Sequence, residues 1–232
     1  MSALSASAIK AVSPALEFYR ENRMTNDVWK REDLSLRDRS LVTVAALIAN
    51  NQSSELAHYM DLALRNGVHP GEISESITHL AFYTGWPSAM AAIATAADIF
   101  DANGISADSL PPAQDATLPL NEETEARRVA MVDQMLGPDF QDLAGYTTDV
   151  LFRDLWLRPG LAPRDRSLVT ISALVATGRV AQLTGHTNIG INNGLTKTAI
   201  VGVVTHLAFY AGWPNAMSAA PVVRKVFEER GI

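Results

Sequence analysis

The 232-residue sequence contains no cysteine. This absence excludes a disulfide framework, a thiolate metal site and catalysis by a cysteine nucleophile. Basic charge is also scarce: 19 lysine and arginine residues against 25 aspartate and glutamate residues leave a net charge of −6, and no basic run is present. An acidic chain of this kind argues against nucleic acid or an anionic membrane as a partner.

Long hydrophobic runs are missing too. No apolar run approaches the roughly 20 residues of a membrane-spanning helix, and residues 1–13 lack the charged-then-apolar pattern of a signal peptide. We therefore expect a cytoplasmic protein without a membrane partner. Hydrophobic residues nevertheless make up 47% of the chain, which is ample for a core and for an interface between subunits.

The sequence repeats itself at an offset of 127 residues. Residues 37–43 (RDRSLVT) recur identically at 164–170, and ten of the twelve residues 79–90 (HLAFYTGWPSAM) recur at 206–217. All four tryptophans keep this offset: Trp29 with Trp156, and Trp86 with Trp213. The chain is therefore a tandem duplication. We predict one unit at residues 12–103, a linker and helix at 104–138, and a second unit at 139–230.

Each unit is predicted to be helical. Ser35 is followed three residues later by an acid, which signals a helix start, and Pro163 occupies the same first turn in the second unit. Residues 41–49 and 168–176 are apolar almost all round, which is typical of central helices. Further helices are predicted at 55–66, 70–84, 87–102 and 122–136, and no segment alternates as a strand would. The fold class is all-α, with two tandem helical units related by internal pseudo-symmetry.

The order and spacing of three motifs resemble the carboxymuconolactone decarboxylase family. The motifs are RDRSLVT, the NNG of residues 192–194, and HLAFYAGWP at 206–214. The resemblance implies an all-helical fold shared with the alkylhydroperoxidases, and decarboxylation of a small lactone acid in aromatic catabolism without a metal or organic cofactor. Its single-copy members are hexamers, so a tandem chain is expected to form a homotrimer containing the same six units.

The sequence excludes the peroxidase activity that one branch of this family carries. That branch carries two cysteines and a histidine in the pattern Cys-x-x-Cys-x-x-x-His. In the second unit these three places hold Arg179, Gln182 and His186. A peroxidase needs an attacking thiolate and a resolving thiol, and neither exists here.

The decarboxylation that the resemblance implies makes three demands on the protein. In 4-carboxymuconolactone the departing carboxylate is vinylogous to the lactone carbonyl, so the substrate is its own electron sink. The protein must supply cations for the carboxylates, a donor at the developing oxyanion, and an acid that returns a proton to carbon.

A stripe of acid–base groups is expected on the helix before the Gly-Trp-Pro break. Glu72, Glu75, His79 and Tyr83 fall on one helix face. His79 and Glu75 are candidate catalytic residues and Tyr83 a candidate substrate-binding residue. The equivalent histidine and tyrosine of the second unit, His206 and Tyr210, are candidate catalytic residues. The alternative is that both histidines are buried and only hold the helix break in shape.

His186 is the sharper catalytic candidate. The resemblance places it at the position of the family's reactive-site histidine, whereas the first unit has Tyr59 there. The alternative is a surface histidine on a partly polar helix.

Arginines and tryptophans are the candidate substrate-binding groups. Arg39 and Arg166 have the bidentate geometry that carboxylates require, and Arg179 competes for the same role. Alternatively, Arg39 and Arg166 pair with the neighbouring acids Asp38 and Asp165. Trp86 and Trp213 are further candidates, although aromatic residues of this kind more often belong to a core.

The polar groups are distributed unequally between the units. The first unit has Glu72 and Glu75 but lacks the second histidine; the second has His186 but carries Ala199 and Gly202 in place of the two glutamates. Either one site takes elements from both halves, or one half is a scaffold. We favour the second unit as the working half, because Ala199 and Gly202 would open room beside His206.

Three functions compete at this point. The first is the cofactor-free decarboxylase. The second reuses the scaffold for another acid–base reaction, such as an isomerisation or cyclisation. The third is a ligand-binding oligomer without catalysis, which the unequal retention of polar groups disfavours.

Overall fold

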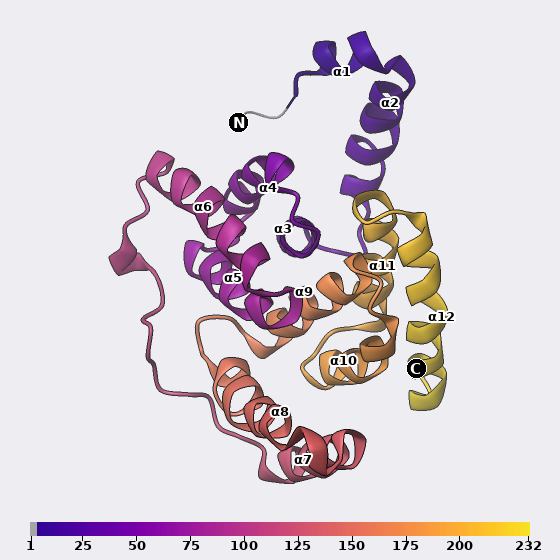
Figure 1. The fold of residues 1–232 in the computed structure, drawn as a ribbon. Helices are drawn as coiled ribbons and strands as arrows, with labels where there is room; N and C mark the ends of the chain where they lie inside the picture. The colour runs from indigo at the N-terminus through magenta and orange to yellow at the C-terminus, as the bar shows by residue number, and fades with distance from the viewer. Residues whose placement is uncertain (1–3) are drawn as a thin grey trace.

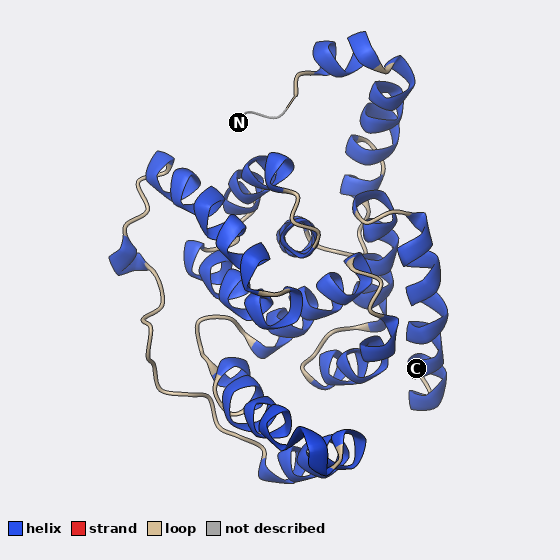
Figure 2. Ribbon diagram, viewed as in Figure 1, coloured by secondary structure: helices blue, strands red, loops and turns tan. Residues whose placement is uncertain are grey.

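The computed structural model describes residues 4–232, and within them every regular element is a helix (Figure 2). The main helices of the first half are α1 (Ala6–Val12), α2 (Pro14–Tyr19), α3 (Leu36–Ala49), α4 (Ser53–Arg65), α5 (Pro70–Thr84) and α6 (Trp86–Ala102). Those of the second half are α7 (Glu122–Leu136), α8 (Gln141–Tyr146), α9 (Pro163–Ala176), α10 (Val180–Asn192), α11 (Lys197–Tyr210) and α12 (Trp213–Arg230). The all-α prediction is confirmed.

Short π and 3-10 helices fill part of the remaining chain, and some of them repeat at the same offset. The repeated pairs are η1 (Arg20–Thr25) with η5 (Thr147–Phe152), and η2 (Val28–Lys30) with η6 (Leu155–Leu157). The others are η3 (Ala107–Ser109) and η4 (Pro138–Phe140).

The helix starts follow the local signals of the sequence. The Ser35 hydroxyl accepts a hydrogen bond from the backbone N–H of Asp38, and Pro163 occupies the first turn of α9, as predicted. The bounds predicted for α5 and α7 are confirmed, whereas α4 begins at Ser53, two residues earlier than expected. Gly85, at φ 92°, separates α5 from α6, because this left-handed backbone favours a residue without Cβ.

Helices α3 and α9 form the centre of the molecule and pack on each other (Figure 1). Both bury almost their whole surface, which confirms the prediction of two central apolar helices. Helix α5 packs on α9 as well as on α3, and α11 packs on α3 as well as on α9. The two units therefore share one hydrophobic core, and the helices of one copy complete the surroundings of the other.

Charged side chains join the two units beside this core. Arg37 donates to Asp165 at 2.7 Å, and Arg164 donates to Asp38 at 2.5 Å. The acids at the first turns of α3 and α9 therefore pair across the duplication, at helix ends where a negative charge also opposes the dipole.

Two peripheral arms flank the centre. The first comprises α1, α2 and η1 and is called here the N-terminal arm; the second comprises α7, α8 and η5 and lies at the opposite side of the molecule (Figure 1). An outer segment, residues 105–121, connects α6 to α7 and contains only the short η3, as expected for a linker. The apolar side predicted for α7 is only partly covered, because Val132 is buried but Met135 is 70% exposed. Among residues 4–232, no helix has the length and apolar character needed to cross a membrane.

Candidate functional site

Two clusters of polar side chains are related by the internal repeat, and each combines both copies. The first, called here the His206 site, contains Trp29, Arg39, Thr43, Tyr59, His206 and Tyr210. The second, called here the His79 site, contains His79, Tyr83, Trp156, Arg166, Thr170 and His186. The structure thus places elements of both halves in each site. The expectation of a site within the second unit alone is wrong, because His186 and His206 belong to different clusters.

The two central histidines are held in the same way. His206 Nε2 lies 2.7 Å from Thr43 Oγ1, and His79 Nε2 lies 2.7 Å from Thr170 Oγ1. Both threonine hydroxyls donate to backbone carbonyls, so they accept from Nε2–H. On the opposite edge Nδ1 accepts from an arginine, at 3.3 Å in the His206 site and 3.4 Å in the His79 site. Both rings are therefore assigned as neutral, with the proton on Nε2.

Burial keeps these histidines neutral. It lowers the pKa of His206 to about 3 and that of His79 well below its usual range, and the neighbouring arginine in each site acts in the same direction. An imidazole that is fully hydrogen-bonded and neutral at pH 7 positions its neighbours and does not supply a proton as an imidazolium. The alternative of a buried histidine that holds the α5 and α11 ends in shape is therefore compatible with this geometry.

The two central arginines are fully buried beneath the histidines. Arg39 Nη2 donates to Asp33 at 2.8 Å and to the Arg31 carbonyl at 2.8 Å. Arg166 Nη2 makes the same pair of bonds, to Glu75 at 2.7 Å and to the Arg158 carbonyl at 2.8 Å. Within residues 4–232, only Nε of each guanidinium lacks a hydrogen-bond partner. Both arginines therefore pair with acids of the protein, as the alternative expected. The expected partners, Asp38 and Asp165, are wrong, because the observed ones are Asp33 and Glu75.

The carboxylate that pairs with the arginine has exchanged places between the sites. The position equivalent to Asp33 is Gly160, and a Cβ there would lie 2.8 Å from Glu75 Cγ. The position equivalent to Glu75 is Gly202, and a Cβ there would lie 3.1 Å from Asp33 Cγ. Each site therefore holds one acid facing one glycine. In the His206 site Asp33 faces Gly202, and in the His79 site Glu75 faces Gly160. The expectation that Gly202 opens room beside His206 is wrong, since Asp33 and Leu34 fill that space.

A layer of aromatic side chains covers each histidine. In the His206 site Trp29 Nε1 donates to the Tyr210 hydroxyl at 2.8 Å, and that hydroxyl donates to the Tyr59 hydroxyl at 2.9 Å. In the His79 site Trp156 Nε1 donates to the Tyr83 hydroxyl at 2.9 Å. Here the ring of His186 takes the place of Tyr59.

His186 is partly buried between aromatic rings. It stacks on Trp156 with an interplanar angle of 14° and meets Tyr83 edge-on at 5.2 Å between centroids. Burial lowers the pKa of His186 to about 4 and raises the pKa of Tyr83. Among the described side chains, His186 Nδ1 has no hydrogen-bond partner. A neutral imidazole with an unsatisfied nitrogen in a dry environment is suited to hydrogen-bond a ligand.

The remaining candidates are exposed at the surface. Arg179 is the exposed N-cap residue of α10, seven residues before His186. Trp86 and Trp213 are 60% and 57% exposed, so the alternative that they belong to the core is wrong. Trp213 lines a pocket of about 660 Å³ at the His206 site.

Comparison with known proteins agrees with this duplicated geometry. The sequence profile of the carboxymuconolactone decarboxylase family matches the chain twice, at residues 14–98 and 141–225. The chain belongs to this family. The resemblance that the three motifs carry is therefore confirmed.

Two relatives from this comparison are named as decarboxylases. A 4-carboxymuconolactone decarboxylase from Acinetobacter baylyi is 37% identical over 92 residues, which is 40% of this chain and 69% of that protein. A nitrosuccinic acid decarboxylase from Metarhizium robertsii is 34% identical over 82 residues, or 35% of this chain and 57% of that protein. These similarities support a carboxy-lyase-like member of the family, and the two relatives are named for different acids.

Several site residues of this family member escaped the sequence reasoning. Thr43 and Thr170 lie inside the repeated RDRSLVT motif, and that invariance between copies was the available signal. Asp33 and Arg158 lie outside the motifs, so only the structure shows that Asp33 faces Gly202 and that Arg158 donates to Glu75. The described residues contain no cluster of three or more metal-ligating His, Cys, Asp or Glu side chains.

The two buried histidines and the partly buried His186 predict a pH dependence of stability. His79, His186 and His206 all have a lowered pKa in the folded state, so the unfolded chain binds more protons below about pH 6.5. Above pH 6.5 these imidazoles are neutral in both states and cost no stability, and as the pH falls from 6.5 toward the folded pKa values the folded state is progressively destabilised. Each group contributes a slope of about 1.4 kcal/mol per pH unit. Urea unfolding between pH 7 and pH 5 measures this, and a constant free energy of unfolding over that window would contradict it.

Proposed function

We propose that this chain is a cofactor-free decarboxylase of a small lactone carboxylic acid, resembling 4-carboxymuconolactone decarboxylase in aromatic catabolism, and that the reaction takes place at the His79 site. The observation that supports this choice most is the neutral His186, whose Nδ1 is unpaired beside Tyr83, on the helix that Arg179 caps. The family and its two decarboxylase-named relatives support the reaction class.

The proposed reaction breaks one carbon–carbon bond. The bond between the ring and its carboxylate cleaves, carbon dioxide leaves, and the electron pair moves through the ring alkene onto the lactone carbonyl oxygen to give a dienolate. A proton, drawn ultimately from water, then returns to carbon and restores the neutral lactone. The net change is loss of carbon dioxide and gain of one proton, and the substrate itself accepts the electrons.

Each requirement of this reaction has a candidate group at the His79 site. Arg179 is the exposed cation that holds a substrate carboxylate. The neutral imidazole of His186 donates to the developing oxyanion, and the Tyr83 hydroxyl, which remains protonated because burial raises its pKa, hands the proton to carbon. Arg166, Glu75 and His79 lie beneath this layer and act as positioning residues.

Turnover of a defined substrate tests the proposal. The protein is incubated with 4-carboxymuconolactone while carbon dioxide release and loss of the conjugated lactone absorbance are followed. Release of one carbon dioxide per lactone consumed supports the proposal. Consumption of the lactone without carbon dioxide would instead support the second reading, an isomerase or cyclase built on the same scaffold.

We also propose that the chain assembles as a homotrimer. Exposed apolar side chains occur at equivalent positions of both copies, as an interface that repeats around a symmetric assembly requires. Examples are Leu16 with Leu143, Tyr19 with Tyr146, and Met90 with Met217. Light scattering is expected to give about three times the chain mass of 25.0 kDa. A monomer mass would contradict the assembly and leave the reaction proposal standing.

A further inference from the structure

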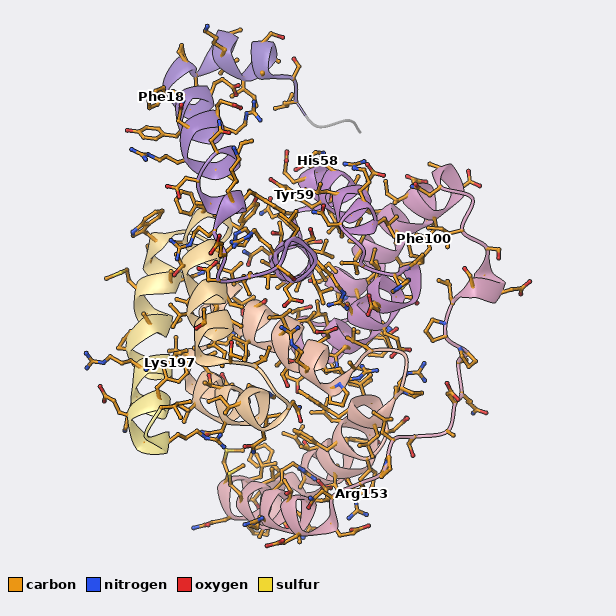
Figure 3. The ribbon with its side chains drawn as sticks, turned by 180° about the vertical axis from the view of Figure 1, so that it is seen from behind. Phe18, His58, Tyr59, Phe100, Arg153 and Lys197 are labelled. Carbon is orange, nitrogen blue, oxygen red and sulfur yellow. The ribbon has the colours of Figure 1, made fainter. Side chains whose placement is uncertain are left out.

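The His206 site opens into a pocket. The pocket has a volume of about 660 Å³ and lies between the N-terminal arm, α4 and the junction of α11 with α12. Figure 3 shows Tyr59 on the side of α4 toward that arm. Most of its wall is apolar or aromatic: Ile9, Leu16, Met24, Leu47, Phe209 and Trp213. A volume of this size accommodates a molecule of one or two fused rings.

The charges that line this pocket do not favour an acid. Among the described residues of its wall Arg20 is the one cation, and both its Nε and Nη2 donate to the Glu17 carboxylate at 2.6 Å. Glu55 also lines the wall, and within the described chain it forms no ion pair. The uncompensated charge of the wall is therefore negative, and a bound carboxylate would be repelled.

The half-buried Tyr59 hydroxyl is one of the hydrogen-bond donors that remain available in this wall, beside the side chains of Tyr19, Asn50 and Trp213. Trp29 donates to Tyr210, and Tyr210 donates to Tyr59, so the chain of donors ends at the Tyr59 hydroxyl. Within residues 4–232 the Tyr59 hydroxyl donates to no side chain or carbonyl. Burial raises the pKa of Tyr59, so its proton is retained at neutral pH. The Tyr59 hydroxyl can therefore donate to a carbonyl or hydroxyl oxygen of a ligand.

The equivalent residues of the His79 site show how far the two mouths have diverged. Gln52, Glu55 and Tyr59 of the His206 pocket correspond to Arg179, Gln182 and His186. A neutral amide thus stands where the other site has a cation, and an acid stands where the other site has an amide. The two sites share their buried scaffold but differ by two units of charge at these three equivalent positions.

We propose that the pocket of the His206 site is a second binding site, whose ligand is an uncharged, flat molecule of one or two rings that accepts a hydrogen bond from Tyr59. This goes beyond the proposed decarboxylase, because it concerns the other site and a ligand without a carboxylate. The aromatic walls contribute contact area and the Tyr59 hydroxyl fixes the orientation of the ligand.

An isosteric pair of probes tests this ligand class. Binding of 2-naphthamide and of 2-naphthoate to the full chain is measured by titration calorimetry at pH 7. We expect the neutral amide to bind at least about tenfold more tightly than the carboxylate, and Tyr59→Phe to weaken amide binding about fivefold through loss of one hydrogen bond. Glu55→Gln should tighten binding of the carboxylate while changing that of the amide by less than about twofold.

A control variant accompanies the same titrations, and three outcomes would overturn the proposal. Glu122→Gln removes an exposed acid on α7 and should leave binding of the two probes unchanged. Equal or tighter binding of 2-naphthoate overturns the proposal. So does amide binding that is insensitive to Tyr59→Phe, or the absence of amide binding because a second copy of the chain fills the pocket. Each readout is binding rather than turnover, so failure here is distinct from failure of the decarboxylase.

Discussion

Replacing His186 by phenylalanine is expected to lower kcat/KM for decarboxylation by about 10²- to 10³-fold, the usual cost of losing one donor to a developing oxyanion. Phenylalanine retains the stack on Trp156 and the edge contact with Tyr83, so the loss reports the imidazole and not the packing. The measurement is the rate of carbon dioxide release from 4-carboxymuconolactone over a range of substrate concentrations.

The control for this variant is His58→Phe, the same substitution at an exposed histidine on α4. Circular dichroism and the unfolding midpoint establish that both variants are folded. A loss below about threefold in His186→Phe would remove His186 from the reaction. An equal loss in His58→Phe would show that the effect is not specific to the His79 site.

Asp33→Gly is expected to destabilise the protein by about 3 kcal/mol, because it leaves the fully buried guanidinium of Arg39 without its carboxylate. Adding Gly202→Glu should recover most of this loss. The recovery is expected because Glu75 already reaches Arg166 from the equivalent position of the other site, facing Gly160. Urea unfolding of the wild type, the single variant and the double variant measures both effects.

Helix propensity alone would also favour replacing a helical glycine, by roughly 0.5–1 kcal/mol. The control is therefore Gly202→Ala in the Asp33→Gly background, which supplies the propensity without the carboxylate. If the glutamate variant is no more stable than the alanine variant, the exchange of acid and glycine between the sites does not stabilise the buried arginine. The reverse exchange on the other side, Glu75→Gly with Gly160→Asp, should recover less stability, because a Cβ at residue 160 would also lie 2.8 Å from Pro111 Cγ.

Much of the fold could be predicted because its causes are local. The Ser35 cap, the first-turn Pro163 and the break at Gly85 each fix a helix end through backbone hydrogen bonds or backbone conformation, and the structure has helix boundaries at these points. The apolar run of α3 predicted its central place, because a helix without a polar face has to be buried.

The arrangement of the sites was harder to predict. Comparing residues 127 positions apart shows which residues differ between the copies, but not which residues lie opposite them in space. Gly202 in place of a glutamate suggested open space, but Asp33 from the other copy occupies it. Trp86 and Trp213 suggested a core, yet both are more than half exposed, because apolar composition does not distinguish a core from a surface. The unequal distribution of polar groups between the copies did indicate that a site takes residues from both halves.

The central claim is that the His79 site is one site built from both copies, and a double-mutant cycle tests it most directly. The cycle measures kcat/KM for carbon dioxide release in the wild type, in Tyr83→Phe from the first copy, in His186→Phe from the second, and in the double variant. If the two side chains act together in one site, the double variant should be little slower than His186→Phe alone. Losses that multiply in the double variant would show that the two residues act independently, and would contradict a single shared site.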